Sequence, residues 1–350
     1  MTNEVEIIGG GIGGLAAAIA LRRTGRTVTV RERDAALPAT GTALALWPAA
    51  LRALDAIGVG GDVRRAGVRQ RSAAFLRPDG SRIAAIDLER WRRRTGDDVV
   101  LLSRPALLAI LHRAAAEAGA ELRAGEPVRD GDVDAELVVA ADGVFSRTRE
   151  RLFGPVSRAR PTGVTAWRGT LDGRRTDTAA EVWGRGVKFG VTPHEGGRTN
   201  WFASAPGTFP PGDEVARLRG MFAGWAPPVR TVLDALDGAT VLRHEVFVTP
   251  ALPSFTRGRV ALIGDAAHAM PPDLGRGACE ALIDAVALAG HVRSAAGVPE
   301  ALRRYDRERR PATRRLARMA GLAARLTHVR HALPVRDRLL RTAMLAGPPG

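Results

Sequence analysis

A glycine-rich turn near the start of the chain constrains the fold more than any other stretch. Five of the six residues from 9 to 14 are glycine. An apolar run precedes them, and an alanine-rich helical stretch follows and leads to a β-branched run that ends at Glu32. Residues 4–32 therefore predict a strand, a turn, a helix and a second strand, the βαβ unit of a parallel sheet.

The turn has the glycine spacing of a dinucleotide-binding site. Gly9 permits the tight turn, Gly11 lets the backbone approach a pyrophosphate, and Gly14 lets the helix pack on the strand. The helix N-terminus favours the phosphate charge. Glu32 is expected to accept hydrogen bonds from an adenosine ribose, and Arg33 beside it is a further cofactor-binding candidate. This unit alone does not distinguish NAD from FAD.

The rest of the chain contains two kinds of sequence pattern. Buried-strand and helix patterns surround a stretch of short strands rich in aromatic residues, and an arginine-rich helical pattern follows. We predict an α/β fold: a discontinuous Rossmann-type domain from residues 1–66, 101–154 and 256–294, an inserted mostly β substrate domain from 67–100 and 155–255, and a C-terminal helical segment 295–350.

Two later strands also end in an aspartate and a glycine. Residues 141–149 read A-D-G-V-F-S-R-T-R, and residues 264–268 read G-D-A-A-H. Together with the R-x-x-L setting of Arg104 and the W-R-G at 167–169, these motifs are similar to those of the single-component flavoprotein aromatic hydroxylases. The chain resembles the p-hydroxybenzoate hydroxylase and salicylate hydroxylase group of that family.

This resemblance implies that the Rossmann-type domain binds FAD. Asp265 would accept hydrogen bonds from the ribityl hydroxyls, Arg104 suits the pyrophosphate, and the Asp142 segment is associated with the FAD phosphates and the nicotinamide cofactor. A helix starting near Gly277 would direct its positive end at the flavin. Further cofactor-binding candidates are Gly264, Pro271, Gly275 and Ala278. Arg276 departs from the pattern, because many relatives have Gln there.

The resemblance also implies a reaction. NADPH or NADH would reduce FAD, dioxygen would add to give a flavin hydroperoxide, and this species would hydroxylate or epoxidise an aromatic or other electron-rich small molecule. The flavin carries this chemistry, so no catalytic side chain is singled out. Two alternatives stay open: an FAD-dependent oxidase or dehydrogenase, and a non-enzymatic binder on the same fold.

Composition narrows the class of protein. The formal net charge is +15, but arginines are interleaved with acids along the chain, which disfavours nucleic-acid binding. Cys279 is the single cysteine, so we expect neither a disulfide framework nor a cysteine metal site, and the histidine spacing predicts no metal site either. The chain has no leader pattern and no apolar run near ~20 residues, so we expect a cytoplasmic protein without a membrane span.

The substrate side is less defined by sequence. In the strand pattern at 187–192, Val187, Phe189 and Val191 alternate with Lys188, Gly190 and Thr192. If the first set packs under the sheet, Lys188 lies on the face toward the flavin and would hold a phenolate or carboxylate of the substrate. A solvent-facing lysine is the alternative. Further candidates for lining this site are Trp183, Trp201 and Pro272.

Overall fold

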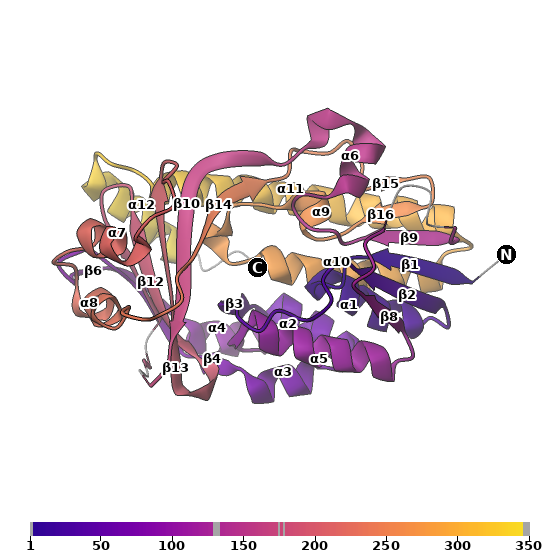
Figure 1. Cartoon of the computed structure of the whole chain (residues 1–350), viewed down its shortest axis with the longest axis horizontal. Coiled ribbons are helices and arrows are strands. Elements are labelled where there is room, and N and C mark those ends of the chain that lie inside the picture. The colour runs from indigo at the N-terminus through magenta and orange to yellow at the C-terminus, as the bar shows by residue number, and fades with distance from the viewer. Residues whose placement is uncertain (1–2, 129–133, 174–175, 178, 346–350) are drawn as a thin grey trace.

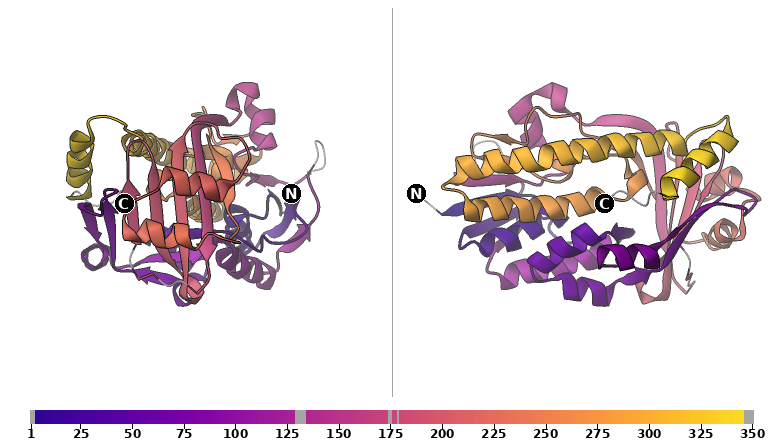
Figure 2. Two further views of the ribbon diagram at one scale, coloured as in Figure 1. Left: turned by 60° about the vertical axis from the view of Figure 1, so that its left-hand side comes forward. Right: turned by 180° about the vertical axis from the view of Figure 1, so that it is seen from behind.

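The computed structural model describes residues 3–128, 134–173, 176–177 and 179–345. The molecule is elongated and has two halves, each organised around a large β-sheet (Figure 1). The chain starts in one half, crosses twice to the other and back, and finally returns along a long helix that spans both (Figure 2).

A six-stranded sheet forms the core of the first half, which we call the cofactor half. Five of its strands are parallel, and the edge strand β15 is antiparallel. Every residue of β9 is buried, as expected for a parallel sheet covered by helices. In spatial order the strands are β15 (Thr256–Arg257), β16 (Val260–Leu262), β9 (Leu137–Ala140), β1 (Glu4–Ile8), β2 (Thr27–Glu32) and β8 (Glu121–Ala124).

Small and branched apolar side chains let helices pack closely in this half. All residues from Ile12 to Leu21 are buried, because this helix lies among the sheet and two other helices. The helices concerned are α1 (Ile12–Arg22), α5 (Arg104–Glu117) and α10 (Gly277–Ser294). The predicted βαβ unit at residues 4–32 is thus present, with both strands in one parallel pair.

The structure also contains a small antiparallel sheet that was not predicted from the sequence. It consists of β3 (Ala43–Leu46), β7 (Val99–Ser103) and β4 (Val68–Gln70), and α2 (Pro48–Ala56) and α3 (Gly60–Ala66) connect its strands. β4 falls in the range 67–100 predicted for the substrate domain but pairs with β7. The small sheet therefore combines strands from both predicted ranges.

A seven-stranded sheet forms the second half, which we call the substrate half. Its strands all fall within residues 67–100 and 155–255. Helices α7 (Glu214–Met221) and α8 (Pro227–Asp234) contribute to an apolar core on one face of the sheet. In spatial order the strands are β14 (Leu242–Val248), β10 (Arg160–Leu171), β13 (Arg198–Pro206), β12 (Lys188–His194), β11 (Ala179–Trp183), β5 (Ser72–Leu76) and β6 (Arg82–Asp87).

The opposite face of this sheet turns toward the cofactor half. Asn200 on β13 accepts a hydrogen bond from the Ala43 amide of β3 at 3.0 Å, and Ser204 lies 3.3 Å from His328. The long helix α11 (Val298–Thr327) leads to that contact, and α12 (Leu333–Leu345) then packs on β6. The short elements are α4 (Leu88–Thr95), α6 (Arg147–Phe153), α9 (Asp265–His268), η1 (Pro155–Ser157), η2 (Glu195–Gly197) and η3 (Pro272–Leu274).

Candidate cofactor and substrate site

The glycine turn joins β1 to α1. A Cβ on Gly14 would lie 1.9 Å from the Gly9 carbonyl oxygen, and a Cβ on Gly9 would lie 2.5 Å from that of Ala141. Gly9 also has a φ of 104°, which other residues rarely adopt. A Cβ on Gly11 would meet no described atom within 4 Å. Packing therefore requires Gly9 and Gly14, whereas Gly11 exposes backbone at a helix N-terminus to a space that a phosphate can enter.

Glu32 ends β2 beside this turn. Its Oε2 accepts a hydrogen bond from the Gly10 amide at 2.7 Å, and its Oε1 accepts one from the Asp34 amide at 3.0 Å. The carboxylate is thus held in place by the backbone, and each oxygen keeps a lone pair for a ligand hydroxyl. The side chain of Arg33 is 78% exposed and lies 3.6 Å from Asp34, so its cofactor role stays a prediction.

Asp142 follows β9, the strand next to β1. Its Oδ2 accepts a hydrogen bond from the Thr148 amide at 3.1 Å, but its Oδ1 is buried and has no hydrogen-bond partner among the described residues. A buried acceptor without a donor costs free energy, which a ligand that donates a hydrogen bond would recover. Asp142 is therefore suited to bind a ligand at the same end of the sheet as the glycine turn.

Arg149 holds the two aspartate segments together, a role that the sequence did not reveal. Its buried guanidinium donates to the carbonyl oxygens of Val144, Ser157 and Ala266 at 2.6, 2.8 and 3.0 Å. Burial lowers the pKa of this side chain, although Asp142 opposes that shift. The arginine of the motif is thus a structural clamp between the segment after β9 and α9.

Asp265 begins α9 directly after β16. Its side chain is exposed and makes no hydrogen bond to a described residue, while Gly264 before it has a φ of 58° and donates its amide to Asp284 at 2.9 Å. A Cβ on Gly277 would lie 3.8 Å from the Asp265 carboxylate, so the start of α10 is adjacent. A free carboxylate next to a helix N-terminus suits a ligand that carries both hydroxyl and anionic groups.

Arg104 begins α5 on the side of the small sheet. Ser103 caps the helix by accepting the Ala106 amide at 3.2 Å, and the Arg104 amide donates to the Thr42 carbonyl at 3.1 Å. The Arg104 guanidinium is exposed and has no ion-pair partner among the described residues. It is therefore available to an anionic ligand, as the sequence analysis predicted for the pyrophosphate.

A chain of buried charges lies behind the third motif. Arg276 donates to Glu280 at 3.1 Å, Arg309 donates to Glu280 at 2.6 Å and to Asp284 at 2.7 Å, and Asp284 lies 2.5 Å from His268. Burial opposes the charge of His268, but Asp284 raises its pKa. Arg276, at the position where many relatives have Gln, is thus paired with the buried carboxylate of Glu280, one helical turn away.

Lys188 is on the face of β12 that turns to the cofactor half, while Phe189 and Val191 pack in the apolar core on the other side. The lysine is 5% exposed, which contradicts the solvent-facing alternative. Its ammonium lies 3.0 Å from Asp273 of η3 and 3.5 Å from Glu181 of β11. Burial opposes the charge, but the two carboxylates raise the pKa of Lys188. Its charge is therefore already balanced by the protein.

The two tryptophans predicted beside Lys188 lie on opposite faces of the sheet. Trp183 is opposite Lys188 in the register and donates to Glu181 at 2.9 Å. Trp201 is fully buried and stacks on Phe189 with ring centroids 5.7 Å apart, so the prediction that it lines the substrate site is wrong. It pairs with Val191 of β12, whose side chain lies in the same apolar core. Pro272 begins η3, next to Asp273.

The register brings together residues that the sequence analysis did not select as site residues, although Arg168 belongs to the W-R-G motif. Phe202 on β13 lies opposite Gly190 on β12 and Arg168 on β10, so all three are on the face toward the cofactor half. A Cβ on Gly190 would lie 2.1 Å from the Phe202 ring, which therefore crosses over the glycine. Arg168 lies 2.5 Å from His244 of β14. The spacing of these residues in the sequence carries no signal of this cluster.

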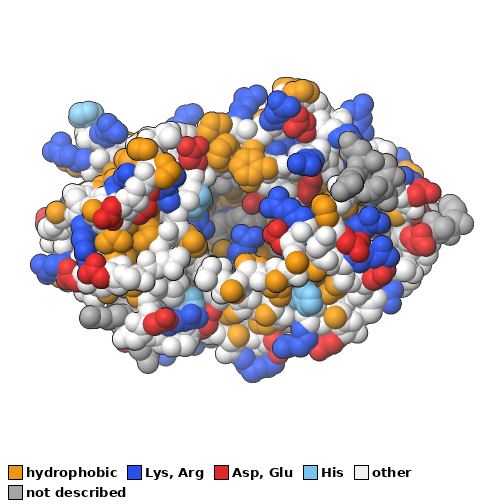
Figure 3. Space-filling view, viewed as in Figure 1, with side chains coloured by type: hydrophobic (Ala, Val, Ile, Leu, Met, Phe, Trp, Pro, Cys, Tyr) orange, Lys and Arg blue, Asp and Glu red, His pale blue; other side chains and the backbone are white. Residues whose placement is uncertain are grey.

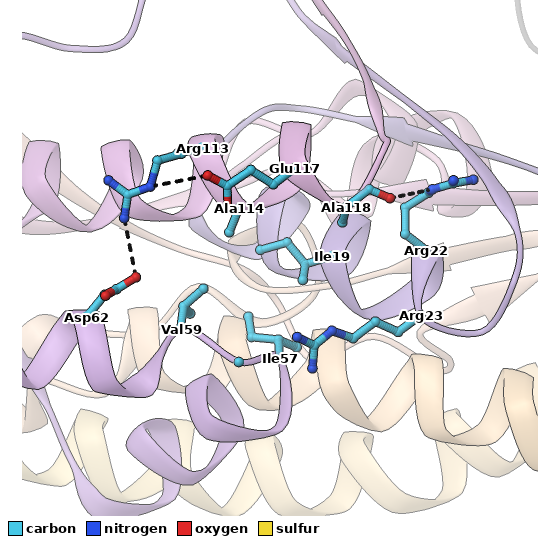
Figure 4. A pocket seen from close by; sticks show the side chains of 11 residues that line it. Ile19, Arg22, Arg23, Ile57, Val59, Asp62, Arg113, Ala114, Glu117 and Ala118 are labelled. Atoms are coloured by element: carbon cyan, nitrogen blue, oxygen red, sulfur yellow. Dashed lines mark hydrogen bonds and ion pairs between the residues drawn. The ribbon is translucent and has the colours of Figure 1, made fainter.

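A separate pocket of about 360 Å³ lies between α1, α5 and the turn from α2 to α3 (Figure 4). It is at the end of α1 remote from the glycine turn. Arg113 lies 3.3 Å from Asp62, while Arg22 and Arg23 donate to carbonyl oxygens at helix C-termini at 3.0 and 2.8 Å. Because these arginines already have protein acceptors, we assign no ligand to this pocket.

The cofactor half now has a consistent set of free groups. The buried acceptor of Asp142, the exposed carboxylate of Asp265 and the uncapped N-terminus of α1 follow the carboxyl ends of parallel strands. The uncapped N-terminus of α10 lies next to Asp265. These groups fit a dinucleotide with hydroxyl and phosphate groups, and a second sheet faces them. Fold and site therefore define a dinucleotide-binding protein.

Comparison with known proteins identifies the family. A family model described as an FAD binding domain matches residues 2–172 and 230–320. The chain is 34% identical over 323 residues to an aurachin C monooxygenase/isomerase of Stigmatella aurantiaca, covering 86% of this chain and 84% of the relative. It is 31% identical over 344 residues to an FAD-dependent urate hydroxylase of Klebsiella pneumoniae, covering 92% and 90%.

A third relative and a solved structure agree with this. The chain is 33% identical over 333 residues to a 2-heptyl-3-hydroxy-4(1H)-quinolone synthase of Mycobacteroides abscessus, covering 89% of this chain and 87% of the relative. The crystal structure of Klebsiella pneumoniae HpxO with FAD and uric acid matches with a TM-score of 0.88 and 28% identity, covering 97% and 92%. The chain therefore belongs to the FAD binding domain family and is an FAD-dependent monooxygenase with NAD(P)H as electron donor.

No helix among the described residues is both long enough and apolar enough to span a membrane.

Proposed function

We propose that this monooxygenase acts on a fused nitrogen-containing aromatic ring bound between the seven-stranded sheet and FAD. The observation that carries the proposal is the Phe202 ring lying across Gly190 on the sheet face toward the cofactor half. An aromatic ring there offers a flat surface on which a planar substrate can stack. The names of two relatives add support, since one contains a quinolone and the other urate.

In this proposal the cofactor half holds FAD along the ends of its parallel strands. Gly11, the α1 N-terminus and Arg104 bind the pyrophosphate. Glu32 accepts hydrogen bonds from the hydroxyls of the adenosine ribose, and Asp265 accepts hydrogen bonds from the ribityl hydroxyls. Asp142 uses its buried free oxygen for a further hydrogen bond from the cofactor. Pro271, Gly275, Gly277 and Ala278 form the loop and helix start beside the flavin ring.

When bound, FAD supplies the redox chemistry that takes electrons from NAD(P)H and passes one oxygen atom of dioxygen to the substrate. The chain's own residues bind and orient the reactants and exclude water. Lys188 does so indirectly: its ion pair with Asp273 ties η3 to the substrate sheet. Trp183 and Pro272 form the wall next to this pair. The need for NAD(P)H and the single buried thiol of Cys279 fit a cytoplasmic location.

A substrate panel tests the proposal. Holoenzyme is mixed with NADH or NADPH and with fused heteroaromatics such as 4-hydroxyquinoline and urate, and with single-ring phenols of similar acidity. We expect fused rings to accelerate nicotinamide oxidation and to yield a product heavier by one oxygen atom. Acceleration by single-ring phenols alone would contradict the proposed substrate class while leaving the monooxygenase activity intact.

A further inference from the structure

Two cations at the junction of the halves lack the acidic partners that Lys188 has. Arg168 and Arg104 make no ion pair with a carboxylate among the described residues, whereas Lys188 is balanced by Asp273 and Glu181. Burial, and then the charge of Arg104, lower the pKa of Arg168. Two neighbouring cations without a counter-ion repel each other, and an anion bound from outside the protein would relieve this repulsion.

Arg168 contacts a histidine and keeps hydrogen-bond donors for a ligand. The guanidinium lies 2.5 Å from Nε2 of His244, and burial followed by the charge of Arg168 lowers the pKa of this histidine to about 4. The imidazole is therefore neutral near pH 7 and accepts one N–H of the arginine, which leaves the other donors free. Basic and histidine side chains border the hollow between the halves (Figure 3).

We propose that Arg168, oriented by His244, binds an anionic oxygen of the aromatic substrate and so determines its class: a planar ring that bears a carboxylate, phenolate or enolate. The inference rests on the proposed function, because it needs a ring stacked on Phe202. The sequence analysis gave the anion-binding role to Lys188. The inference gives this role to Arg168, which has no acidic partner among the described residues. Arg168 is then a specificity-determining residue.

The position of Arg168 favours the substrate over a nucleotide phosphate as the source of the anion. Arg168 is on the substrate sheet, in register with Phe202 and two strands away from Gly190. The groups assigned to phosphate, Gly11 and Arg104, belong to the cofactor half. With Arg104 balanced by the FAD pyrophosphate, its neighbour Arg168 is the cation left without a counter-ion. A ring lying on Phe202 would direct a substituent at one edge toward Arg168.

Matched acid and amide probes test this with the holoenzyme. The pairs are 2-naphthoate with 2-naphthamide, quinaldate with quinaldamide, and salicylate with salicylamide, each titrated at pH 7.5 while the flavin absorption is followed. We expect at least one acid to bind more tightly than its amide. Arg168→Gln should raise the Kd of that acid about tenfold or more and change the Kd of the amide less than about twofold. Arg160→Gln, the same charge change at an exposed end of the same strand, should change neither.

Three further readouts separate the outcomes. Retained FAD and an unchanged KM for NADH in Arg168→Gln are expected, whereas a rise in that KM alone assigns the cation to the nucleotide and overturns the inference. Loss of FAD from the variant overturns it in favour of the cofactor. The absence of any acid preference in the wild-type protein also overturns it, while amide binding by a yellow holoenzyme would leave the proposed function standing. If Arg168→Gln does not fold, Arg168→Lys, which keeps the charge, should lose part of the preference, and an unchanged preference would contradict the inference.

Discussion

At the scale of the residue, two glycines of one turn carry different constraints. A Cβ on Gly14 would collide with the Gly9 carbonyl, so Gly14→Ala should lower the free energy of unfolding by about 1–3 kcal/mol even in the absence of FAD. A Cβ on Gly11 meets open space, so Gly11→Ala should leave the apoprotein stable and weaken FAD binding. Denaturant unfolding of both apoproteins and FAD titration check this; equal effects of the two substitutions on stability would contradict it.

Asp265 should affect the cofactor and not the fold. Its carboxylate is exposed and has no partner among the described residues, so Asp265→Ala should leave the melting temperature of the apoprotein nearly unchanged. Loss of the proposed ribityl acceptor should weaken FAD binding by about 1–3 kcal/mol. FAD affinity from flavin fluorescence titration checks the prediction, and an unaltered affinity would remove Asp265 from the site.

Lys188 should now affect the fold as well as the substrate. Lys188→Met leaves Asp273 and Glu181 without their cation, and breaking a buried ion pair costs about 3–5 kcal/mol. Adding Asp273→Asn to Lys188→Met should recover part of the loss, as measured by urea unfolding of the single and double variants. No recovery in the double variant would show that the pair is not coupled.

At the scale of the element, a buried charge chain joins α9, α10 and α11. Because Asp284 raises the pKa of His268 in the folded protein, the pair stabilises the fold most below the unfolded value near 6.5, and this stabilisation is lost as pH rises through the folded value. Arg309 and Asp265 are the other charges that act on His268. Free energies of unfolding measured from pH 6 to 9 should therefore fall more steeply with pH in the wild-type protein than in His268→Gln. The exposed His331→Gln is the control, and a wild-type slope in His268→Gln would refute the assignment.

Some helices and strands were predictable from the sequence, and other features of the fold were not. The βαβ unit and the helices α2, α5 and α10 were predictable, because glycine turns, prolines and periodic apolar residues are local signals. The turn between β5 and β6 also follows a local signal, because the Asp79 side chain accepts the Ser81 amide at 2.8 Å. Three features were not predictable: the three-stranded sheet, the burial of Trp201 in the apolar core of the substrate half, and the contact of Arg168 with His244. These depend on which distant strands pair and in which register, and a single sequence does not specify that.

At the scale of the whole molecule, the two halves have different binding roles. The cofactor half presents groups for phosphates, ribose and ribityl hydroxyls at the ends of its parallel strands, and the substrate half presents an aromatic and basic sheet face. The Lys188–Asp273 ion pair, the Asn200–Ala43 hydrogen bond and the His328 contact join them. A substrate held between the halves would be shielded from water on both sides, which an oxygen transfer requires.

The fate of dioxygen tests the central claim most directly. Holoenzyme turns over an accepted substrate with NADH or NADPH under ¹⁸O₂, and product mass, peroxide and nicotinamide oxidation are measured together. The account predicts one labelled oxygen atom in the product for each nicotinamide oxidised, with little peroxide. Nicotinamide oxidation that yields hydrogen peroxide and no labelled product, across the whole panel of aromatic substrates, would contradict it and identify an oxidase.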